Sequence, residues 1–253
     1  MGRLSNALRD AASPRWGLAY WRARRARIPT ERRARFWLTE HADSVQDAAG
    51  ALAAVTGAAR EECERAYAGA WLPDPVAGDP AVWWPREHLS RLVAAAATLA
   101  RPRTAIEVGV ARGYSSAAIL GALDALGEGG RLHSIDLPPR DEDAEEFVGR
   151  AVPERLRARW ELVLGPSRNE LPDLAERIGP AGLFFHDGDH SYASQREDLE
   201  AAWPHLAPGA VVVVDDIWTP AIFDFADAHG VRVAIASWSE HSDGVGLLRK
   251  SRA

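Results

Sequence analysis

Cysteine and lysine are almost absent from this chain of 253 residues, which contains one of each, Cys63 and Lys250. A single cysteine excludes a disulfide framework within the chain and a cysteine-rich zinc site, and it is typical of a reducing compartment. Long apolar runs are missing too: stretches such as Ala210–Val214 are far too short to span a bilayer. No apolar core of the signal-peptide kind follows Met1. We therefore expect a cytoplasmic protein with no transmembrane segment.

An excess of positive charge is also lacking, because the formal net charge is −6. Binding of the whole chain to nucleic acid is therefore not expected. The charge is nevertheless uneven: residues 1–37 contain ten arginines against Asp10 and Glu31, a net charge of +8, so the remainder must carry −14. Aromatic side chains interleave with these arginines. This segment could lie on an anionic membrane, bind an acidic substrate or pack against another subunit, since we expect a homo-oligomer. A solvated helix docked on its own domain is the simpler interpretation of the segment.

The chain divides into two regions with different sequence patterns. Residues 1–85 contain helix-like pieces broken by prolines and no convincing strand, which predicts an N-terminal helical extension that serves as a substrate lid or in oligomerisation. In residues 86–253, short apolar runs alternate with helical segments, and this alternation predicts an α/β domain around a parallel sheet. The last two strands are joined by the short polar segment 237–243 and should pair antiparallel. The expected strands are Ala105–Val108, Arg131–Ile135, Trp160–Leu164, Leu183–His186, Val211–Val214, Val231–Ala236 and Val245–Arg249.

The first strand is followed by a glycine-rich turn. Gly109 and Gly113 permit a tight turn and a close approach of the backbone to a ligand, and Ser115 or Ser116 can cap the next helix. The spacing differs from that of a dinucleotide site, so the turn is a poor cradle for pyrophosphate. Glu107, at its base, would suit a cation such as the sulfonium and ammonium groups of S-adenosylmethionine. A glycine turn that binds no ligand is the plainer alternative.

The second and third strands also end in candidate ligand groups. Asp136 follows the second strand, where a carboxylate commonly accepts hydrogen bonds from both hydroxyls of a ribose. The alternative is an exposed aspartate in a proline-rich loop. Ser167 follows the third strand in a loop of small residues that could lie along an adenine edge, although an ordinary turn would look the same.

The fourth and fifth strands end in carboxylates. Asp187 follows one strand and Asp215 and Asp216 follow the other, and adjacent parallel strands place such ends side by side. Clustered carboxylates repel one another unless a cation compensates, and oxygen ligands suit Mg²⁺, Mn²⁺ or Ca²⁺. Neighbouring strand residues point in opposite directions, so both Asp215 and Asp216 can face one ion only if the strand ends or bends there. Alternatively, Asp187 and Asp189 cap the next helix and Asp216 is solvated.

His190 lies three residues beyond Asp187. A neutral imidazole close to that carboxylate could accept the proton of a substrate hydroxyl, which would make His190 the catalytic base. A histidine at the start of a helix could equally be a capping or packing residue.

Together, these motifs resemble methyltransferase family 24, the macrocin-type branch of the class I S-adenosylmethionine-dependent methyltransferases. The resemblance covers about residues 89–250 and is most specific in 187–192 together with Asp215 and Asp216. It implies a Rossmann-like sheet of seven mostly parallel strands with the last strand antiparallel, a Mg²⁺ site and His190 as the base. The implied metal ligands are Asp187, Asp215 and Asp216. The implied cofactor-binding residues are Glu107, Gly109, Gly113, Tyr114, Ser115, Asp136, Ser167 and Asp187.

The activity that we expect is metal-dependent transfer of a methyl group from S-adenosylmethionine to a hydroxyl of a small molecule, such as a sugar or a phenolic compound. Three alternatives stay open: a metal-independent methyltransferase of the same fold, a nucleotide- or NAD-binding oxidoreductase, and a non-catalytic nucleotide-binding member of a biosynthetic complex. The spacing of the glycines argues against the oxidoreductase.

Overall fold

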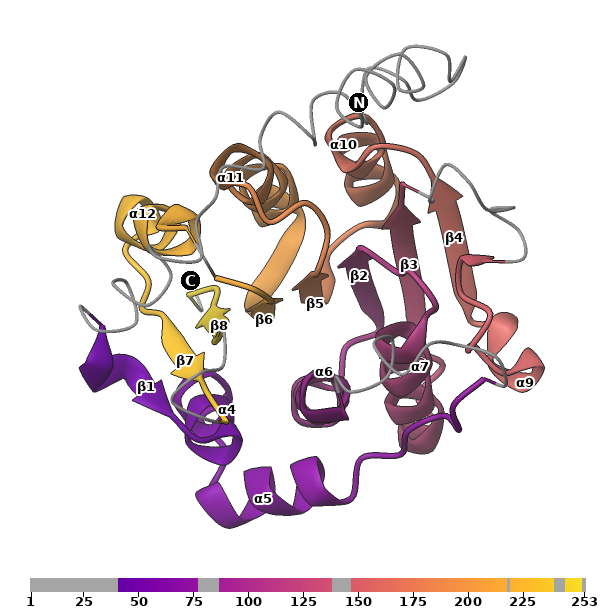
Figure 1. Cartoon of the computed structure of the whole chain (residues 1–253), viewed down its shortest axis with the longest axis horizontal. Coiled ribbons are helices and arrows are strands. Elements are labelled where there is room, and N and C mark those ends of the chain that lie inside the picture. Colours follow the sequence, from indigo (N-terminus) through magenta and orange to yellow (C-terminus); the bar gives the residue numbers. More distant parts are fainter. Residues whose placement is uncertain (1–40, 77–86, 138–146, 218, 239–243, 252–253) are drawn as a thin grey trace, which may run out of the picture.

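A computed structural model describes residues 41–76, 87–137, 147–217, 219–238 and 244–251 (Figure 1). These residues form one eight-stranded sheet with helices on both faces. The expectations for residues 1–40, including the arginine-rich segment, lie outside the described residues.

The expected α/β fold is confirmed. The strands lie in the order β1-β7-β8-β6-β5-β2-β3-β4, and only β8 runs antiparallel to its neighbours β6 and β7. All seven strands predicted from the sequence are present, with bounds that differ by a few residues. They are β2 (Thr104–Val108), β3 (Arg131–Asp136), β4 (Trp160–Leu164), β5 (Ala181–His186), β6 (Leu206–Val214), β7 (Ala234–Ala236) and β8 (Val245–Arg249).

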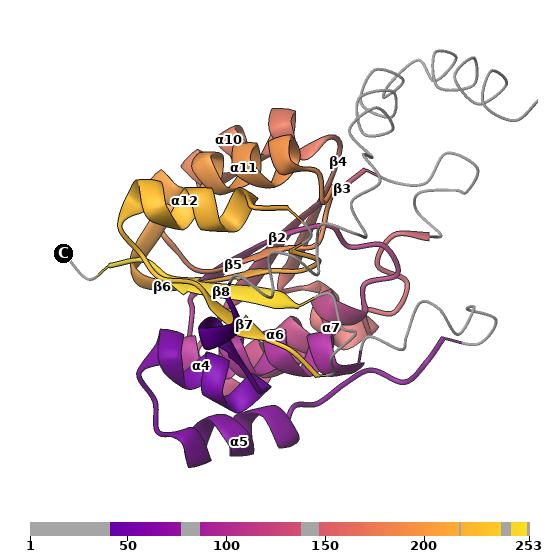
Figure 2. The same cartoon turned by 60° about the vertical axis from the view of Figure 1, so that its left-hand side comes forward.

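Helices cover both faces of the sheet, as Figure 2 shows with the sheet nearly edge-on. One face carries α4 (Ala48–Thr56), α5 (Arg60–Ala68), α6 (Glu87–Ala100) and α7 (Tyr114–Leu126). The other carries α10 (Ser167–Ile178), α11 (Tyr192–Ala202) and α12 (Ala221–His229). The short helix α9 (Glu154–Arg157) precedes β4, and two 3-10 turns, η1 (Ala42–Ser44) and η3 (Trp203–His205), complete the described elements.

The apolar core is divided by the sheet into two layers, because successive strand residues face opposite sides. On β5, Leu183 and Phe185 pack in the layer under α4, α6 and α7, whereas Phe184 packs in the layer under α10, α11 and α12. Burial on both faces explains why the central strands read as continuous apolar runs rather than as alternating ones.

The N-terminal part of the described chain is integrated into this fold. Val45 and Gln46 form β1, which pairs with β7 at one edge of the sheet, so the expectation of no strand within residues 1–85 is wrong. Asp47 caps α4 by accepting a hydrogen bond from the N–H of Gly50, and Leu52 is fully buried in the core. Residues 45–56 therefore belong to the same folded unit as the strands and helices from α6 onward.

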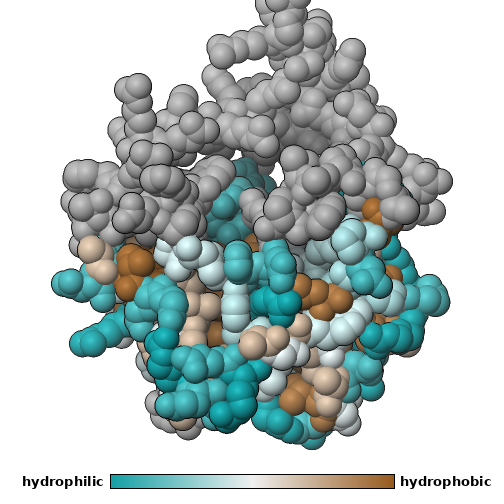
Figure 3. Space-filling model, turned by 60° about the horizontal axis from the view of Figure 1, so that its bottom comes forward, coloured by the Kyte–Doolittle hydropathy of each residue, from teal (hydrophilic) through white to brown (hydrophobic). Residues whose placement is uncertain are grey.

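The described surface is predominantly polar. On the face in Figure 3, hydrophilic side chains dominate and the hydrophobic ones lie singly or in small groups. Among the described residues, Trp71 and Tyr192 are the large hydrophobic side chains with the greatest exposure, 41% and 43%. None of the described helices is long and apolar enough to cross a membrane.

Candidate functional site

The glycine turn after β2 is packed directly against the turn after β5. Gly109 has φ +91°, and a Cβ atom at this position would overlap the carbonyl oxygen of Asp187. The N–H of Gly109 donates to the carbonyl oxygen of Ile135 at 2.9 Å, and the N–H of Asp187 donates to that of Val108 at 2.7 Å. Only glycine allows both the left-handed backbone and this close approach, so Gly109 joins the ends of three strands.

Gly113 has the same restriction at the start of α7. Its φ is +85°, and a Cβ atom would lie 2.7 Å from the Cα atom of Gly149. The preceding residue, Arg112, lies with its guanidinium 3.9 Å from the ring centroid of Phe147, a cation–π contact. The segment 147–152 therefore packs against the outer side of the glycine turn.

Glu107 is fully buried at the base of this turn. Its carboxylate accepts hydrogen bonds from the hydroxyls of Ser115 at 2.7 Å, Ser116 at 2.6 Å and Ser134 at 2.7 Å. Burial raises the pKa of Glu107 to about 7, and the serine hydroxyls act in the opposite direction. In this structure Glu107 and Ser115 hold the turn from within, and their direct contact with a cofactor stays a prediction.

Asp136, the last residue of β3, also braces the glycine turn. Its carboxylate accepts a hydrogen bond from the N–H of Ala111 at 2.7 Å. Burial raises its pKa, against the lowering effect of backbone N–H donors. The residue as a whole is half-buried, so part of it is accessible to solvent. Backbone donors thus already engage this carboxylate, and its bonds to the hydroxyls of a ribose stay a prediction.

Two further residues that we expect to bind the cofactor, Tyr114 and Ser167, form hydrogen bonds with other parts of the protein. The hydroxyl of Tyr114, at the start of α7, accepts a hydrogen bond from the N–H of Val76 at 2.9 Å. The hydroxyl of Ser167, at the start of α10, donates to Asp198 at 2.9 Å. Tyr114 thereby ties the segment before α6 to the glycine turn, and contact of either hydroxyl with a cofactor stays a prediction.

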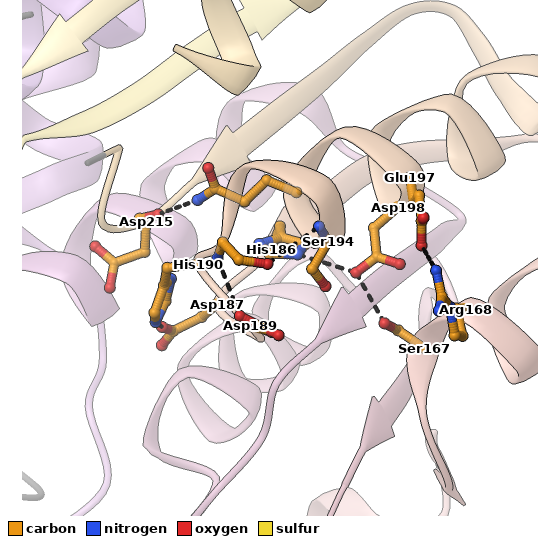
Figure 4. A network of polar contacts seen from close by, with 12 residues as sticks. Ser167, Arg168, His186, Asp187, Asp189, His190, Ser194, Glu197, Asp198 and Asp215 are labelled. Atoms are coloured by element: carbon orange, nitrogen blue, oxygen red, sulfur yellow. Dashed lines mark hydrogen bonds and ion pairs between the residues drawn. The ribbon is translucent and has the colours of Figure 1, made fainter. Parts of the chain in front are cut away.

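The carboxyl ends of β5 and β6 bring His190 between two carboxylates. The Nε2 atom of His190 lies 3.4 Å from an oxygen of Asp216 and 3.8 Å from an oxygen of Asp187. Figure 4 shows the imidazole of His190 next to Asp187, with Asp215 on its other side. A proton placed on this ring would be stabilised by both carboxylates.

The chain turns sharply where β6 ends, which satisfies the condition noted for Asp215 and Asp216. The strand ends at Val214, the N–H of Asp215 donates to the carbonyl oxygen of His186 at 2.9 Å, and Asp216 has φ +50°. Left-handed backbone is uncommon outside glycine, asparagine and aspartate. The bend lets Asp216 turn toward His190 instead of continuing the alternation of the strand.

The fit of a divalent cation can be judged from the donors. Carboxylates at Asp187, Asp215 and Asp216 are the ligand type that Mg²⁺ prefers, and the bend at Asp216 is compatible with convergence. Nevertheless, among the parts of the chain that the structure describes, no group of three or more His, Cys, Asp and Glu side chains is arranged to hold a metal ion. The donor chemistry therefore suits a metal, but a complete ligand set is not preassembled.

Three buried polar residues that the sequence did not single out, His186, Gln195 and Asp198, connect the ends of β5 and β6 to α11. His186, the last residue of β5, contacts Asp198 through its Nε2 atom at 3.0 Å, and Gln195 donates to the carbonyl oxygen of Asp215 at 3.2 Å. Gln195 and Asp198 share the i, i+3, i+4, i+7 face of α11 with Leu199 and Ala202. The sequence signal that could have identified Gln195 and Asp198 is a polar residue at a helix position where the pattern calls for an apolar one.

Comparison with known sequences shows a likeness to methyltransferases. The model of methyltransferase family 24, described as a methyltransferase domain, matches residues 106–217, which confirms the resemblance. Demethylmacrocin O-methyltransferase from Streptomyces fradiae and mycinamicin VI 2''-O-methyltransferase from Micromonospora griseorubida are each 39% identical over 49 residues. These matches cover 19% of this chain and 12% of each relative, so the chain spans about an eighth of the curated relatives that it matches.

Comparison with solved structures supports the fold. The O-methyltransferase from Bacillus cereus in complex with S-adenosylhomocysteine has a TM-score of 0.53 at 20% identity, over 76% of this chain and 90% of that one. The O-methyltransferase TomG from Streptomyces achromogenes, in complex with S-adenosylmethionine, also has a TM-score of 0.53, at 21% identity, over 76% and 88% of the two chains. At this level of identity the likeness concerns the fold.

Proposed function

We propose that this chain, which matches methyltransferase family 24 over residues 106–217, is an S-adenosylmethionine-dependent O-methyltransferase acting on a hydroxyl of a small molecule. One observation carries the proposal: the sheet brings the glycine turn and Asp136 to the same edge as His190 and its two carboxylates. Both substrates of a methyl transfer would then meet at the carboxyl ends of the strands.

The cofactor half of the proposal uses the groups around the glycine turn. Asp136 would accept the ribose hydroxyls, and the turn at Gly109 and Gly113 would let the backbone approach the methionine part. The curated relatives and the solved structures support the same cofactor, because their names include O-methyltransferases and complexes with S-adenosylmethionine or its product.

The reaction half uses His190. The hydroxyl oxygen of the acceptor attacks the methyl carbon as the carbon–sulfur bond breaks, which leaves neutral S-adenosylhomocysteine and a methyl ether. The hydroxyl proton passes to His190, where Asp187 and Asp216 stabilise the resulting imidazolium. The protein otherwise contributes by aligning oxygen, carbon and sulfur, which is the larger part of catalysis for a displacement of this kind.

Calorimetric titration tests the cofactor half. We expect S-adenosylhomocysteine to bind the full chain and NAD not to bind, and we expect Asp136→Ala to weaken S-adenosylhomocysteine binding by about 10- to 100-fold through loss of charged hydrogen bonds. A screen of catechols and sugar diols with S-adenosylmethionine, followed by formation of S-adenosylhomocysteine, would then identify the acceptor. Binding of NAD without S-adenosylhomocysteine would reject the proposal.

A divalent cation is the finer part of the proposal. Asp187, Asp215 and Asp216 would hold Mg²⁺, Mn²⁺ or Ca²⁺, which when bound would lower the pKa of the acceptor hydroxyl and fix its direction. We expect Asp187→Ala to abolish turnover while S-adenosylhomocysteine affinity stays nearly unchanged, which would assign Asp187 to the metal and not to the cofactor. Equal loss of both would argue against a metal site separate from the cofactor site.

A metal-independent methyltransferase with His190 as sole base is the second candidate. It is favoured by the lack, within the described residues, of a group of three side chains ready to bind an ion. Turnover in the presence of a strong chelator decides between the two: loss of activity that Mg²⁺ or Mn²⁺ restores supports the metal, and full activity supports His190 alone.

A further inference from the structure

The inner face of α11 carries two polar side chains that are removed from solvent. Gln195 is 0% exposed and Asp198 is 1% exposed. Buried polar groups are nearly always hydrogen-bonded, because an unmade bond costs free energy. The partners of these two residues therefore show which parts of the fold α11 holds in place.

Gln195 bonds the turn that follows β6. Its Nε2 atom donates to the carbonyl oxygen of Asp215 at 3.2 Å and to that of Asp216 at 3.4 Å, and its Oε1 atom accepts from the hydroxyl of Thr219 at 3.2 Å. One side chain thus bonds Asp215 and Asp216 on one side and Thr219 on the other.

The turn bonded by Gln195 contains a residue with left-handed backbone. Asp216 has φ +50°, a conformation that costs free energy outside glycine and that surrounding contacts stabilise. This conformation places an Asp216 oxygen 3.4 Å from the Nε2 atom of His190. The amide of Gln195 is therefore linked through the backbone to the position of the carboxylate that faces His190.

Asp198 bonds a different part of the molecule. It contacts His186, the last residue of β5, at 3.0 Å and accepts a hydrogen bond from the hydroxyl of Ser167, at the start of α10, at 2.9 Å. Neither of these partners is one of the residues that Gln195 bonds. This separation makes Asp198 a matched control for Gln195.

We infer that Gln195 is a positioning residue for methyl transfer: through its bonds to Asp215, Asp216 and Thr219 it holds the chain after β6 so that Asp216 faces His190. This role rests on the proposed function. It does not involve contact with the cofactor or the acceptor, and it assigns to α11 the alignment of the reaction half.

The decisive variant is Gln195→Glu in the full chain. It keeps the size of the side chain and the acceptor for Thr219, but places a carboxylate oxygen against two carbonyl oxygens. We expect turnover with the best acceptor of the screen to fall about 100-fold, the cost of a misplacement of about 1 Å. Amide hydrogen exchange in the peptide covering 213–221 should become about tenfold faster as the turn opens. Affinity for S-adenosylhomocysteine should stay unchanged.

Two further variants keep the test decisive. Asp198→Asn should leave exchange in 213–221 unchanged, and Thr219→Val should act like Gln195→Glu but more weakly, which serves if Gln195→Glu fails to fold. Unchanged exchange in both Gln195→Glu and Thr219→Val, or loss of S-adenosylhomocysteine affinity in proportion to turnover, would overturn the inference. Exchange reports on the turn even if the wild type binds no S-adenosylhomocysteine, so failure of the proposed function is distinguished from failure of this inference.

Discussion

The two halves of the candidate site are held together in different ways. The half at the ends of β2 and β3 is closed by contacts within its own motif: glycines with positive φ, and Glu107 bonded to three serine hydroxyls. The half at the ends of β5 and β6 is held by a side chain from α11, Gln195. The first half is therefore preformed, and the second depends on more distant packing. Variants at each half should separate these properties.

Gly109→Ala should have the largest effect, because Gly109 joins the two halves. A methyl group there would overlap the carbonyl oxygen of Asp187, so we expect S-adenosylhomocysteine binding and methyl transfer to be lost together and the melting temperature to fall. Calorimetry and thermal unfolding measure both.

The control for this prediction is Gly127→Ala at the end of α7. Gly127 has φ +68°, but nothing lies within 4 Å of the added Cβ atom. This variant should lose only the cost of the left-handed backbone, about 1–2 kcal/mol, and keep its ligand affinity. Equal losses in both variants would mean that backbone strain, and not the contact between the halves, accounts for the effect.

His190→Gln should affect the reaction half alone. Loss of a general base typically lowers turnover by about 10²- to 10⁴-fold, whereas S-adenosylhomocysteine affinity should not change because the glycine turn and Asp136, which we propose bind the cofactor, lie at the ends of β2 and β3. Steady-state kinetics and calorimetry on one preparation would show this. His205→Gln, in η3, is the control, and activity in His190→Gln equal to that of the control would exclude His190 as the base.

Glu107→Gln tests the cofactor half through the pH dependence of stability. The folded-state pKa of Glu107 is raised from 4.5 to about 7, so the stability associated with its protonated form is complete below pH 4.5 and is lost as pH rises through about 7. The glutamine variant does not ionise. Its free energy of unfolding relative to wild type should therefore rise across this window, by on the order of 3 kcal/mol at most.

Urea unfolding of both proteins at several pH values measures this difference. A difference that is constant between pH 4.5 and 7 would mean that Glu107 is not protonated within this range in the folded state. Ser134→Ala is a useful companion, because it removes one donor to the carboxylate and should move its titration further upward.

Sequence predicted the parts of this molecule that depend on local pattern. The seven strands follow from apolar runs, and Gly109 and Gly113 from their place after the first of them. β1 was not predicted because a strand of two residues has no recognisable pattern, and its partner β7 lies about 190 residues further along the chain. The enclosure of Glu107 escaped because its donors converge from α7 and β3 in space.

The reaction half shows the same limit. Asp187, His190 and Asp216 could be selected by residue type, but their relation depends on the positive φ of Asp216 and on the bond from Gln195. Neither is encoded by spacing. The remainder of the site was unpredictable because a buried amide that bonds a distant backbone leaves no local signature beyond a polar residue on an apolar helical face.

Tyr114→Phe should have the smallest effect and decides which group the tyrosine hydroxyl serves. In this structure it accepts the N–H of Val76, so its removal should cost about 1 kcal/mol of stability and accelerate amide exchange at Val76. Unchanged S-adenosylhomocysteine affinity would mean that the hydroxyl serves Val76 and not the cofactor. Tyr192→Phe, which loses a bond to Asp224 instead, is the matched control. A fall in affinity only in Tyr114→Phe would show that the hydroxyl contacts the cofactor, and that the preformed half is closed by its ligand as well as by its own residues.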